Sequence, residues 1–316
     1  MSRGQGSRRG GRRGGKGTPG RGGRTPRARG RQSAPERPSG DRAGPSRRLD
    51  GTPSGPRGQR RRPDDLGGDV VEGRHAVLEL LRVGRRKVHE IVMVEDAPDN
   101  PAAAEILDLA GDRRVPITRV NRRRLDALAE TDAPQGVVAR AAHLRAVPLD
   151  ELLEPNRRGR VPFLVAFDGI TDPGNLGAAL RSAETAGATG IVIPRHRAVR
   201  LTPAAVKAAA GAVEHLDIAL VGGLPAAMAT VTDHGIWTVG LDMGGERSIF
   251  GSDALTGPVM LILGAEGRGL SRLVGRRCDE VVSIPQKGSL DSLNVSAAAA
   301  VACFEVVRRR EAEEAT

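Results

Sequence analysis

Hydrophobic positions divide the chain after residue 68 into short apolar runs and amphipathic stretches that follow one another closely. Apolar runs of four to eight residues are typical of buried strands, and apolar positions three and four apart are typical of helices. In the first part of this region the pattern predicts helices at residues 76–82, 102–110 and 123–129 and strands at 90–94, 116–120 and 135–140. The first folded unit is therefore expected to be a small α/β domain.

A second unit follows a polar connection and shows a stricter alternation of strand and helix. Strands are predicted at residues 162–167, 190–194, 236–241, 259–264 and 280–285, and helices at 178–186, 203–211, 224–232 and 295–310. Such alternation implies a mostly parallel sheet that is covered by helices on both faces. The pattern as a whole predicts a tail at 1–68, a small domain at 69–143, a linker at 144–160 and a larger domain at 161–316.

The N-terminal segment differs in composition from the rest of the chain. Residues 1–63 consist almost entirely of Arg, Gly, Pro and Ser, without aromatic side chains. A segment of this kind cannot bury enough apolar surface to offset the entropy lost on ordering. We therefore predict that the tail is disordered.

Charge is distributed as unevenly as hydrophobicity. The first 63 residues hold 19 Lys and Arg against three carboxylates, a net charge of +16. The other residues hold 30 basic and 35 acidic side chains, so they carry −5 of the total of +11. A basic tail attracts polyanions by releasing their counterions, without sequence preference. RNA is the expected polyanion, and a solubilising arm is the alternative.

The cysteines and the hydropathy of the sequence indicate where in the cell the protein is expected. The two cysteines, Cys278 and Cys303, form no CxxC pair and no Cys/His cluster with metal-ligand spacing. The sequence contains no uninterrupted apolar run long enough to span a bilayer, and the Arg-rich start lacks the apolar core of a secretory signal. We expect a cytoplasmic protein without a bound metal and without a membrane segment.

Three loops carry the candidate chemistry, because each follows a predicted strand of the parallel sheet. They span residues 168–181, 264–270 and 284–296. Ligands of open α/β sheets bind beyond the carboxyl ends of the strands, where these loops lie. The glycines at 264, 267 and 269 spell GxxGxG and not the GxGxxG fingerprint of dinucleotide-binding domains, so a nicotinamide site is not expected.

Taken together, the loops resemble the three ordered motifs of the SpoU/TrmH family of RNA ribose methyltransferases. The first loop reads DGITDPGNLGAALR, the second belongs to ILGAEGRGL, and the third runs from Ile284-Pro to Ser292-Leu-Asn-Val-Ser296. The segment KAAAGAVE at 207–214 also resembles an intervening family segment. The resemblance implies a knotted parallel-sheet fold (a SPOUT-type trefoil knot), a homodimer, and S-adenosylmethionine as the methyl donor.

The resemblance also assigns residues to roles. It implies catalytic or substrate-orienting roles for five side chains: Asn175, Arg181, Glu266, Ser292 and Asn294. It implies cofactor contacts, largely through the main chain, at Leu241, Gly264, Ile284 and Leu293. Arg181 would engage the target nucleotide and promote loss of the hydroxyl proton, and clamping a phosphate is its physically easier role. Structural alternatives are a helix cap for Asn175, a cap of the last helix for Ser292 and Asn294, and a solvated carboxylate for Glu266.

The first folded unit refines the resemblance. Residues 72–77, EGRHAV, and 135–139, QGVVA, resemble the L30e-like substrate-binding domain of members that act on large-subunit rRNA. This implies methylation of a guanosine 2′-hydroxyl in 23S rRNA. The alternatives within the same chemistry are a tRNA methyltransferase and an antibiotic-resistance rRNA methyltransferase. A ribosome-assembly RNA-binding protein without catalysis is the alternative from another class.

Overall fold

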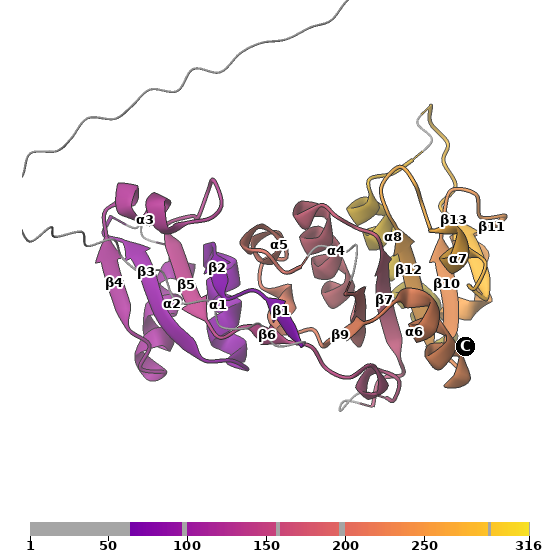
Figure 1. Ribbon diagram of the computed structural model, residues 1–316, viewed down its shortest axis with the longest axis horizontal. Helices are drawn as coiled ribbons and strands as arrows, with labels where there is room; N and C mark the ends of the chain where they lie inside the picture. Colours follow the sequence, from indigo (N-terminus) through magenta and orange to yellow (C-terminus); the bar gives the residue numbers. More distant parts are fainter. Residues whose placement is uncertain (1–63, 97–99, 156–158, 196–199, 290–291, 316) are drawn as a thin grey trace, which may run out of the picture. The chain divides into compact units, whose positions relative to one another are not determined.

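The computed structural model describes residues 64–96, 100–155, 159–195, 200–289 and 292–315 (Figure 1). Residues 1–63, for which the sequence predicts a disordered tail, lie outside the described residues. Residues 65–67, which the sequence assigned to the tail, form strand β1 (Asp65–Gly67). This strand pairs antiparallel with β6 (Leu144–Arg145), so regular structure is present a few residues before the domain start that the hydrophobic pattern indicates.

The first sheet has four strands in the order β2-β5-β3-β4. They are β2 (Val70–Glu72), β3 (Val88–Val94), β4 (Ile117–Val120) and β5 (Val137–Ala141). Its helices are α1 (Arg74–Val83), α2 (Pro101–Asp112) and α3 (Arg122–Leu128). Alternate residues of β3 face opposite sides, so Ile91 joins the core under α1 and α2 while Val92 packs with Leu125 of α3.

The second sheet has seven strands, all parallel, in the order β11-β13-β10-β12-β7-β8-β9. They are β7 (Phe163–Asp168), β8 (Gly190–Pro194), β9 (Ile218–Val221), β10 (Trp237–Leu241), β11 (Arg247–Ser248), β12 (Val259–Gly264) and β13 (Glu280–Ser283). The predicted parallel α/β sheet is confirmed. Strand β9 was not predicted, because a run of only four apolar residues does not distinguish a strand from a buried helical turn.

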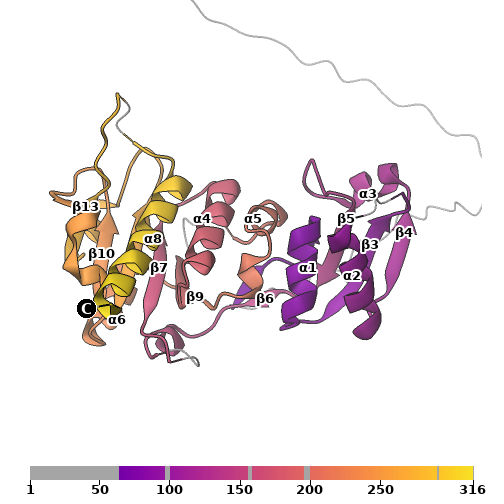
Figure 2. The ribbon, with the colours of Figure 1, turned by 180° about the vertical axis from the view of Figure 1, so that it is seen from behind.

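Helices cover both faces of this sheet, as its continuous apolar strands require. On one face lie α4 (Pro173–Thr185), α5 (Pro203–Ala208) and α8 (Val295–Glu314), with α4 beside α8 in Figure 2. On the other face lie α6 (Leu224–Asp233) and α7 (Arg272–Gly275). Short 3-10 turns at Leu149–Leu152, Ala212–Glu214, Ile249–Gly251 and Asp253–Leu255 complete the fold. Among the described residues no helix is long and apolar enough to cross a membrane.

A joint of buried charge connects the two sheets. Glu214, 1% exposed, accepts hydrogen bonds from Arg86 Nη2 at 2.5 Å and Nε at 3.1 Å. Arg86 Nη1 also donates to the carbonyls of Gly68 and Ala142 at 2.6 and 2.7 Å. Every donor group of this buried guanidinium thus meets an acceptor. We refer to Arg86, Glu214 and their partners as the interdomain joint.

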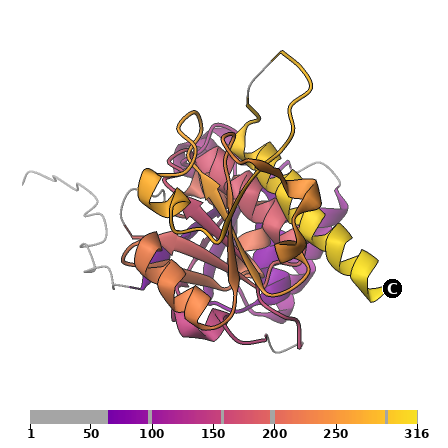
Figure 3. The same cartoon turned by 90° about the vertical axis from the view of Figure 1, so that its right-hand side faces the viewer.

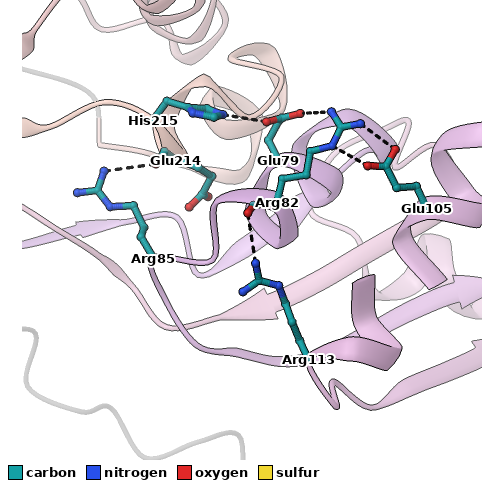
Figure 4. Close-up of polar contacts among 7 residues, drawn as sticks. All are labelled: Glu79, Arg82, Arg85, Glu105, Arg113, Glu214 and His215. Atoms are coloured by element: carbon teal, nitrogen blue, oxygen red, sulfur yellow. Dashed lines mark hydrogen bonds and ion pairs between the residues drawn. The ribbon is translucent and has the colours of Figure 1, made fainter. Parts of the chain in front are cut away.

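A more exposed layer of polar contacts surrounds this joint (Figure 4). Glu79 of α1 accepts from Arg82 of the same helix and contacts His215 Nε2 at 2.8 Å, across the boundary between the two sheets. Arg85 donates to the carbonyl of Leu216 at 2.8 Å and pairs with Asp217. Helix α1 is thereby attached to the segment that follows α5.

Candidate active site

A pocket lies where β10, β12 and β13 end, at the carboxyl edge of the large sheet. All four predicted cofactor-contact residues line it: Leu241, Gly264, Ile284 and Leu293. Two of the predicted catalytic residues, Glu266 and Ser292, also line it. Parallel strands bring their carboxyl ends to one edge, which is why loops far apart in the sequence meet here. Figure 3 shows α8, in yellow, leading away from this loop-bearing edge towards the C-terminus.

The loop after β12 is closed on itself and requires glycine. Ala265 N–H donates to the Gly269 carbonyl at 3.0 Å, and Gly269 N–H donates back to Ala265 at 2.9 Å. A Cβ at Gly264 would stand 2.2 Å from the Gly269 carbonyl carbon, so no side chain fits there. Gly267 and Gly269 adopt φ of 73° and 63°, the left-handed region that glycine enters without steric cost. At its glycines the loop therefore presents main chain to the pocket.

Two aspartates at strand ends brace this loop, and neither was singled out in the sequence. Asp242, directly after β10, accepts from Leu270 N–H at 2.8 Å and from Gly244 N–H at 2.9 Å. Asp168, the last residue of β7, accepts from Ser271 N–H at 2.6 Å. An acidic residue at the end of a buried strand was the available signal, although it does not reveal the partner amide.

The structure joins three of the predicted catalytic residues in a chain of hydrogen bonds. Asn175 Nδ2 donates to Glu266 Oε2 at 3.0 Å, and Asn294 Nδ2 donates to Asn175 Oδ1 at 2.9 Å. Asn294 Oδ1 accepts from Ser296 N–H at 2.8 Å, so Asn294 also caps helix α8. The structural and functional interpretations of Asn294 are thus compatible. These side chains, called the amide relay below, tie α4 and α8 to the loop after β12.

The predicted position of Asn175 ahead of its helix is wrong. Helix α4 begins at Pro173, and Asp172 is its N-cap, with Oδ2 accepting from Asn175 N–H at 2.6 Å. The helix starts earlier than its apolar pattern indicates because proline at the first position is already restricted to helical φ. Asn175 consequently lies in the first turn, and its side chain is free to contact Glu266.

Arg181 does not lie among the residues that line this pocket. It lines a separate cavity of about 380 Å³, together with His75 and Glu79 of α1, Glu184 of α4, and His215. Six residues separate it from Asn175, which is about 9 Å along a helix and a different side of it. Among the described residues, no hydrogen bond or ion pair engages its guanidinium group. Within one chain, the structure therefore separates Arg181 from the other four predicted catalytic residues.

The other groups that could carry site chemistry are metal-ligating side chains and the thiols of the two cysteines. Among the described residues, no cluster of three or more His, Cys, Asp or Glu side chains is suited to a metal ion. Burial raises the pKa of Cys303 to about 12. Burial, and then the charges of Asp279 and Asp168, raise the pKa of Cys278 to about 12. Neither thiol is a nucleophile at neutral pH.

Comparison with known proteins places both parts of the chain in one family. Residues 162–304 match the model of the SpoU rRNA Methylase family, and residues 70–147 match that of RNA 2′-O ribose methyltransferase substrate binding. The chain is 39% identical over 246 residues to a protein of Pseudomonas putida named 23S rRNA (guanosine-2′-O-)-methyltransferase RlmB, which covers 77% of this chain and 97% of that protein. A Photobacterium profundum protein of the same name is 38% identical, over 78% of this chain and all of its own length.

A solved structure of a SpoU methyltransferase also matches this chain. The SpoU methyltransferase AviRb from Streptomyces viridochromogenes, in complex with AdoMet, matches with a TM-score of 0.62 and 31% identity, over 77% of this chain and 90% of its own. The fold and the pocket define an α/β methyltransferase. The chain belongs to the SpoU rRNA methylase family.

Proposed function

We propose that this protein transfers the methyl group of S-adenosylmethionine to the 2′-hydroxyl of a guanosine in 23S rRNA. The observation that carries the proposal is the pocket at the carboxyl edge of the large sheet, where Leu241, Gly264, Ile284 and Leu293 meet the amide relay. The names of the relatives, which match across both domains, support the substrate and the position of methylation.

The residues of the pocket fit this cofactor. Leu241, Ile284 and Leu293 offer apolar walls for a flat adenine ring, and the absence of a side chain at Gly264 leaves main-chain groups accessible. Polar edges of the ring can pair with such groups, as pockets of this type pair a few backbone donors and acceptors with an apolar lining. When bound, the cofactor supplies an electrophilic methyl group on its sulfonium.

The chain's own polar groups orient the nucleophile. A ribose hydroxyl attacks only when it is held in line and its proton has a path away. The amide relay fixes the Glu266 carboxylate at the rim of the pocket, and the Ser292 hydroxyl lies nearby. Glu266 and Ser292 position the ribose hydroxyl, with Asn175 and Asn294 holding Glu266 in place.

Arg181 acts on the substrate from outside the pocket of its own chain. Its guanidinium, which has no partner among the described residues, suits a phosphate next to the target ribose, because an Arg fork matches phosphate oxygens. A homodimer, which the family resemblance implies, would bring such a group to the pocket of the partner. Exposed apolar side chains support a dimer: Leu293 (40% exposed) and Phe304 of α8 (47% exposed) lie uncovered in the single chain.

The N-terminal tail adds RNA affinity without sequence preference. Its net charge of +16 favours any polyanion through counterion release. Since its proposed substrate is ribosomal RNA, the enzyme acts in the cytoplasm, where ribosomal RNA is made. The trefoil knot that the family resemblance implies belongs to the same proposal.

Transfer of labelled methyl groups tests the function directly. The full chain is incubated with methyl-tritiated S-adenosylmethionine and either unmodified 23S rRNA or unmodified tRNA, and the labelled nucleoside is identified after digestion. We expect label in 23S rRNA as 2′-O-methylguanosine. Label in tRNA alone would identify a tRNA methyltransferase, and RNA binding without label would identify an assembly factor without catalysis.

A further inference from the structure

Two segments that resemble the substrate-binding domain, at 72–77 and 135–139, come together in the first domain. Glu72, fully buried, accepts from Glu130 N–H at 2.5 Å and from Thr131 N–H at 3.2 Å, and it also accepts from the Thr131 hydroxyl. Lys207, from helix α5, donates to that hydroxyl at 3.1 Å. The connection between α3 and β5 is thus held by a buried carboxylate and by the neighbouring domain.

The end of this connection has a strained backbone. Gln135 adopts φ of 55°, a left-handed conformation that non-glycine residues rarely enter. Its Oε1 accepts from Arg74 N–H at 3.2 Å, so it caps helix α1 across the domain, where Gly73 offers no side chain. Its Nε2 has no acceptor among the described residues. Strain held by surrounding contacts is characteristic of binding sites, where a group must be presented in one orientation.

A cavity of about 200 Å³ opens beside Gln135. Arg74 and Arg122, the first residues of α1 and α3, line it together with Val94 and Gly136. This volume is below the roughly 300–1,000 Å³ of pockets for drug-sized ligands, so it suits a single base or phosphate. Its lining combines two cations, a side-chain amide and apolar surface. We call it the arginine cleft.

The arginines of the cleft differ from others of the same domain. Arg82, Arg86 and Arg140 pair with carboxylates. Among the described residues, no hydrogen bond or ion pair engages the guanidinium groups of Arg74 or Arg122, nor those of the next two residues, Arg123 and Arg124. Three of these cations occupy the first turn of α3, where the helix dipole disfavours positive charge unless an anion is present. The cleft is therefore a cationic surface whose charge no described residue neutralises by an ion pair.

We propose that the arginine cleft is the surface by which the first domain recognises RNA. Arg122, with Arg123 and Arg124 beside it, contacts phosphodiesters, and Arg74 and the free amide of Gln135 contact an unpaired base. Single-stranded RNA offers base edges to such groups, and an Arg plane can stack on a base where aromatic side chains are scarce. In Figures 1 and 2 the α3–β5 connection and the segment after β13 rise from the same edge of the molecule. One RNA can then reach both the cleft and the pocket.

This inference rests on the proposed function, and it adds residues that determine substrate recognition. The test compares the full-length Arg74→Ala/Arg122→Ala variant with wild type and with Arg114→Ala. Arg114 is a matched control: it is exposed, it is likewise unpaired among the described residues, and it precedes β4 whereas Arg122 follows it. The tail is present in all three proteins, so its contribution to RNA binding cancels.

Affinity for unmodified 23S rRNA is measured by filter binding at several salt concentrations. We expect the double variant to bind at least tenfold more weakly, with a salt slope smaller by about 0.7–0.9, since Arg122 is the one phosphate contact that it loses. KM for RNA should rise, while kcat at saturating RNA and affinity for S-adenosylmethionine remain unchanged. Arg114→Ala should stay within twofold of wild type.

Equal losses in the double variant and in Arg114→Ala, or wild-type binding by both, would overturn the inference. If the double variant unfolds, the single variant Arg122→Ala decides, because the exposed Arg122 side chain has no partner among residues 64–315 as far as these are described. Failure of wild type to methylate any RNA would refute the proposed function instead. Binding still reports on the cleft in that case.

Discussion

The interdomain joint and the pocket are both polar, yet they are built in opposite ways. At the joint, the charges of Arg86 and Glu214 are buried and satisfied by each other and by two carbonyls. At the pocket, main chain at Gly264 and the side chains of Glu266 and Ser292 remain exposed to a ligand. Polar groups that pair within the chain hold the fold, and polar groups left open mark where a second molecule binds.

Arg181 shows the value of this distinction. It lines a cavity beside the joint, and its neighbour across the cavity, Glu79, pairs with Arg82 and His215. Arg181 itself has no partner in the part of the chain that the structure describes. By the same criterion it belongs with the pocket and the arginine cleft rather than with the joint, despite its location.

The largest expected effect is loss of stability on breaking the joint. Glu214→Gln leaves the charge of Arg86 buried without its counter-ion, and removing one partner of a buried pair costs about 3–5 kcal/mol. Urea unfolding of the full chain should show this loss, with little change in affinity for S-adenosylmethionine. The double variant Arg86→Met/Glu214→Leu should recover most of it, since no unpaired charge remains. A single-variant loss below about 1 kcal/mol would contradict the role of the joint.

Removing the guanidinium of Arg181 should affect catalysis and not stability. We expect Arg181→Ala to lower kcat about 100-fold, within the range for a group that assists proton transfer or charge stabilisation. Its unfolding free energy should stay near that of wild type because no internal partner is lost. Single-turnover methylation of 23S rRNA and urea unfolding provide the two measurements. Normal methylation by this variant would remove Arg181 from the active site.

A smaller effect is expected at the amide relay. Asn175→Ala removes the hydrogen bonds to Glu266 and Asn294, so the carboxylate loses its orientation. We expect a decrease of about tenfold in kcat, which corresponds to about 1.4 kcal/mol, the size of one to two ordinary hydrogen bonds. Ser182→Ala, on the same helix, is the control because, within the described part of the chain, its hydroxyl donates only to the Ala178 carbonyl. Equal kinetics for both variants would show that the relay is not needed.

The smallest effect at neutral pH concerns the buried thiol of Cys303. Its pKa is raised from 9.0 to about 12 by burial, so between these values the folded state keeps a proton that the unfolded state has released. Stability should therefore be unaffected below about pH 8 and fall above pH 9, with at most about 1.4 kcal/mol per pH unit from Cys303. Cys278, whose pKa is also raised to about 12, acts in the same direction, so the Cys303 share is the difference between wild type and Cys303→Ala. Urea unfolding at pH 8 and pH 10.5 measures this, and the chain has no tyrosine to titrate in the same range. An identical decline in Cys303→Ala would assign the loss to other groups.

Much of the pocket could be predicted from the sequence because most of its residues lie in or directly before three ordered loops, and Leu241 ends a predicted strand. Leu241, Gly264, Ile284 and Leu293 indeed line one pocket. The bracing of the loop by Asp168 and Asp242 could not be predicted, because the amides that they accept from are up to 103 residues away.

The joint was equally hidden in the sequence. The segment at 207–214 was recognised by resemblance, but the partner of Glu214 is Arg86, 128 residues earlier. The start of α4 was also not predicted. Because the helix begins at Pro173 and not at residue 178, Asn175 lies in its first turn, on a different side from Arg181 six positions later.

Affinity for S-adenosylmethionine in the Gly264→Ala variant tests most directly that the pocket is a main-chain cofactor site. A Cβ there would stand 2.2 Å from backbone of Gly269, so the loop must move. Gly257→Ala is the control, because nothing lies within 4 Å of its added Cβ. Calorimetric titration of the full-length proteins should show at least tenfold weaker binding for Gly264→Ala and unchanged binding for Gly257→Ala. Wild-type affinity in Gly264→Ala would contradict the account.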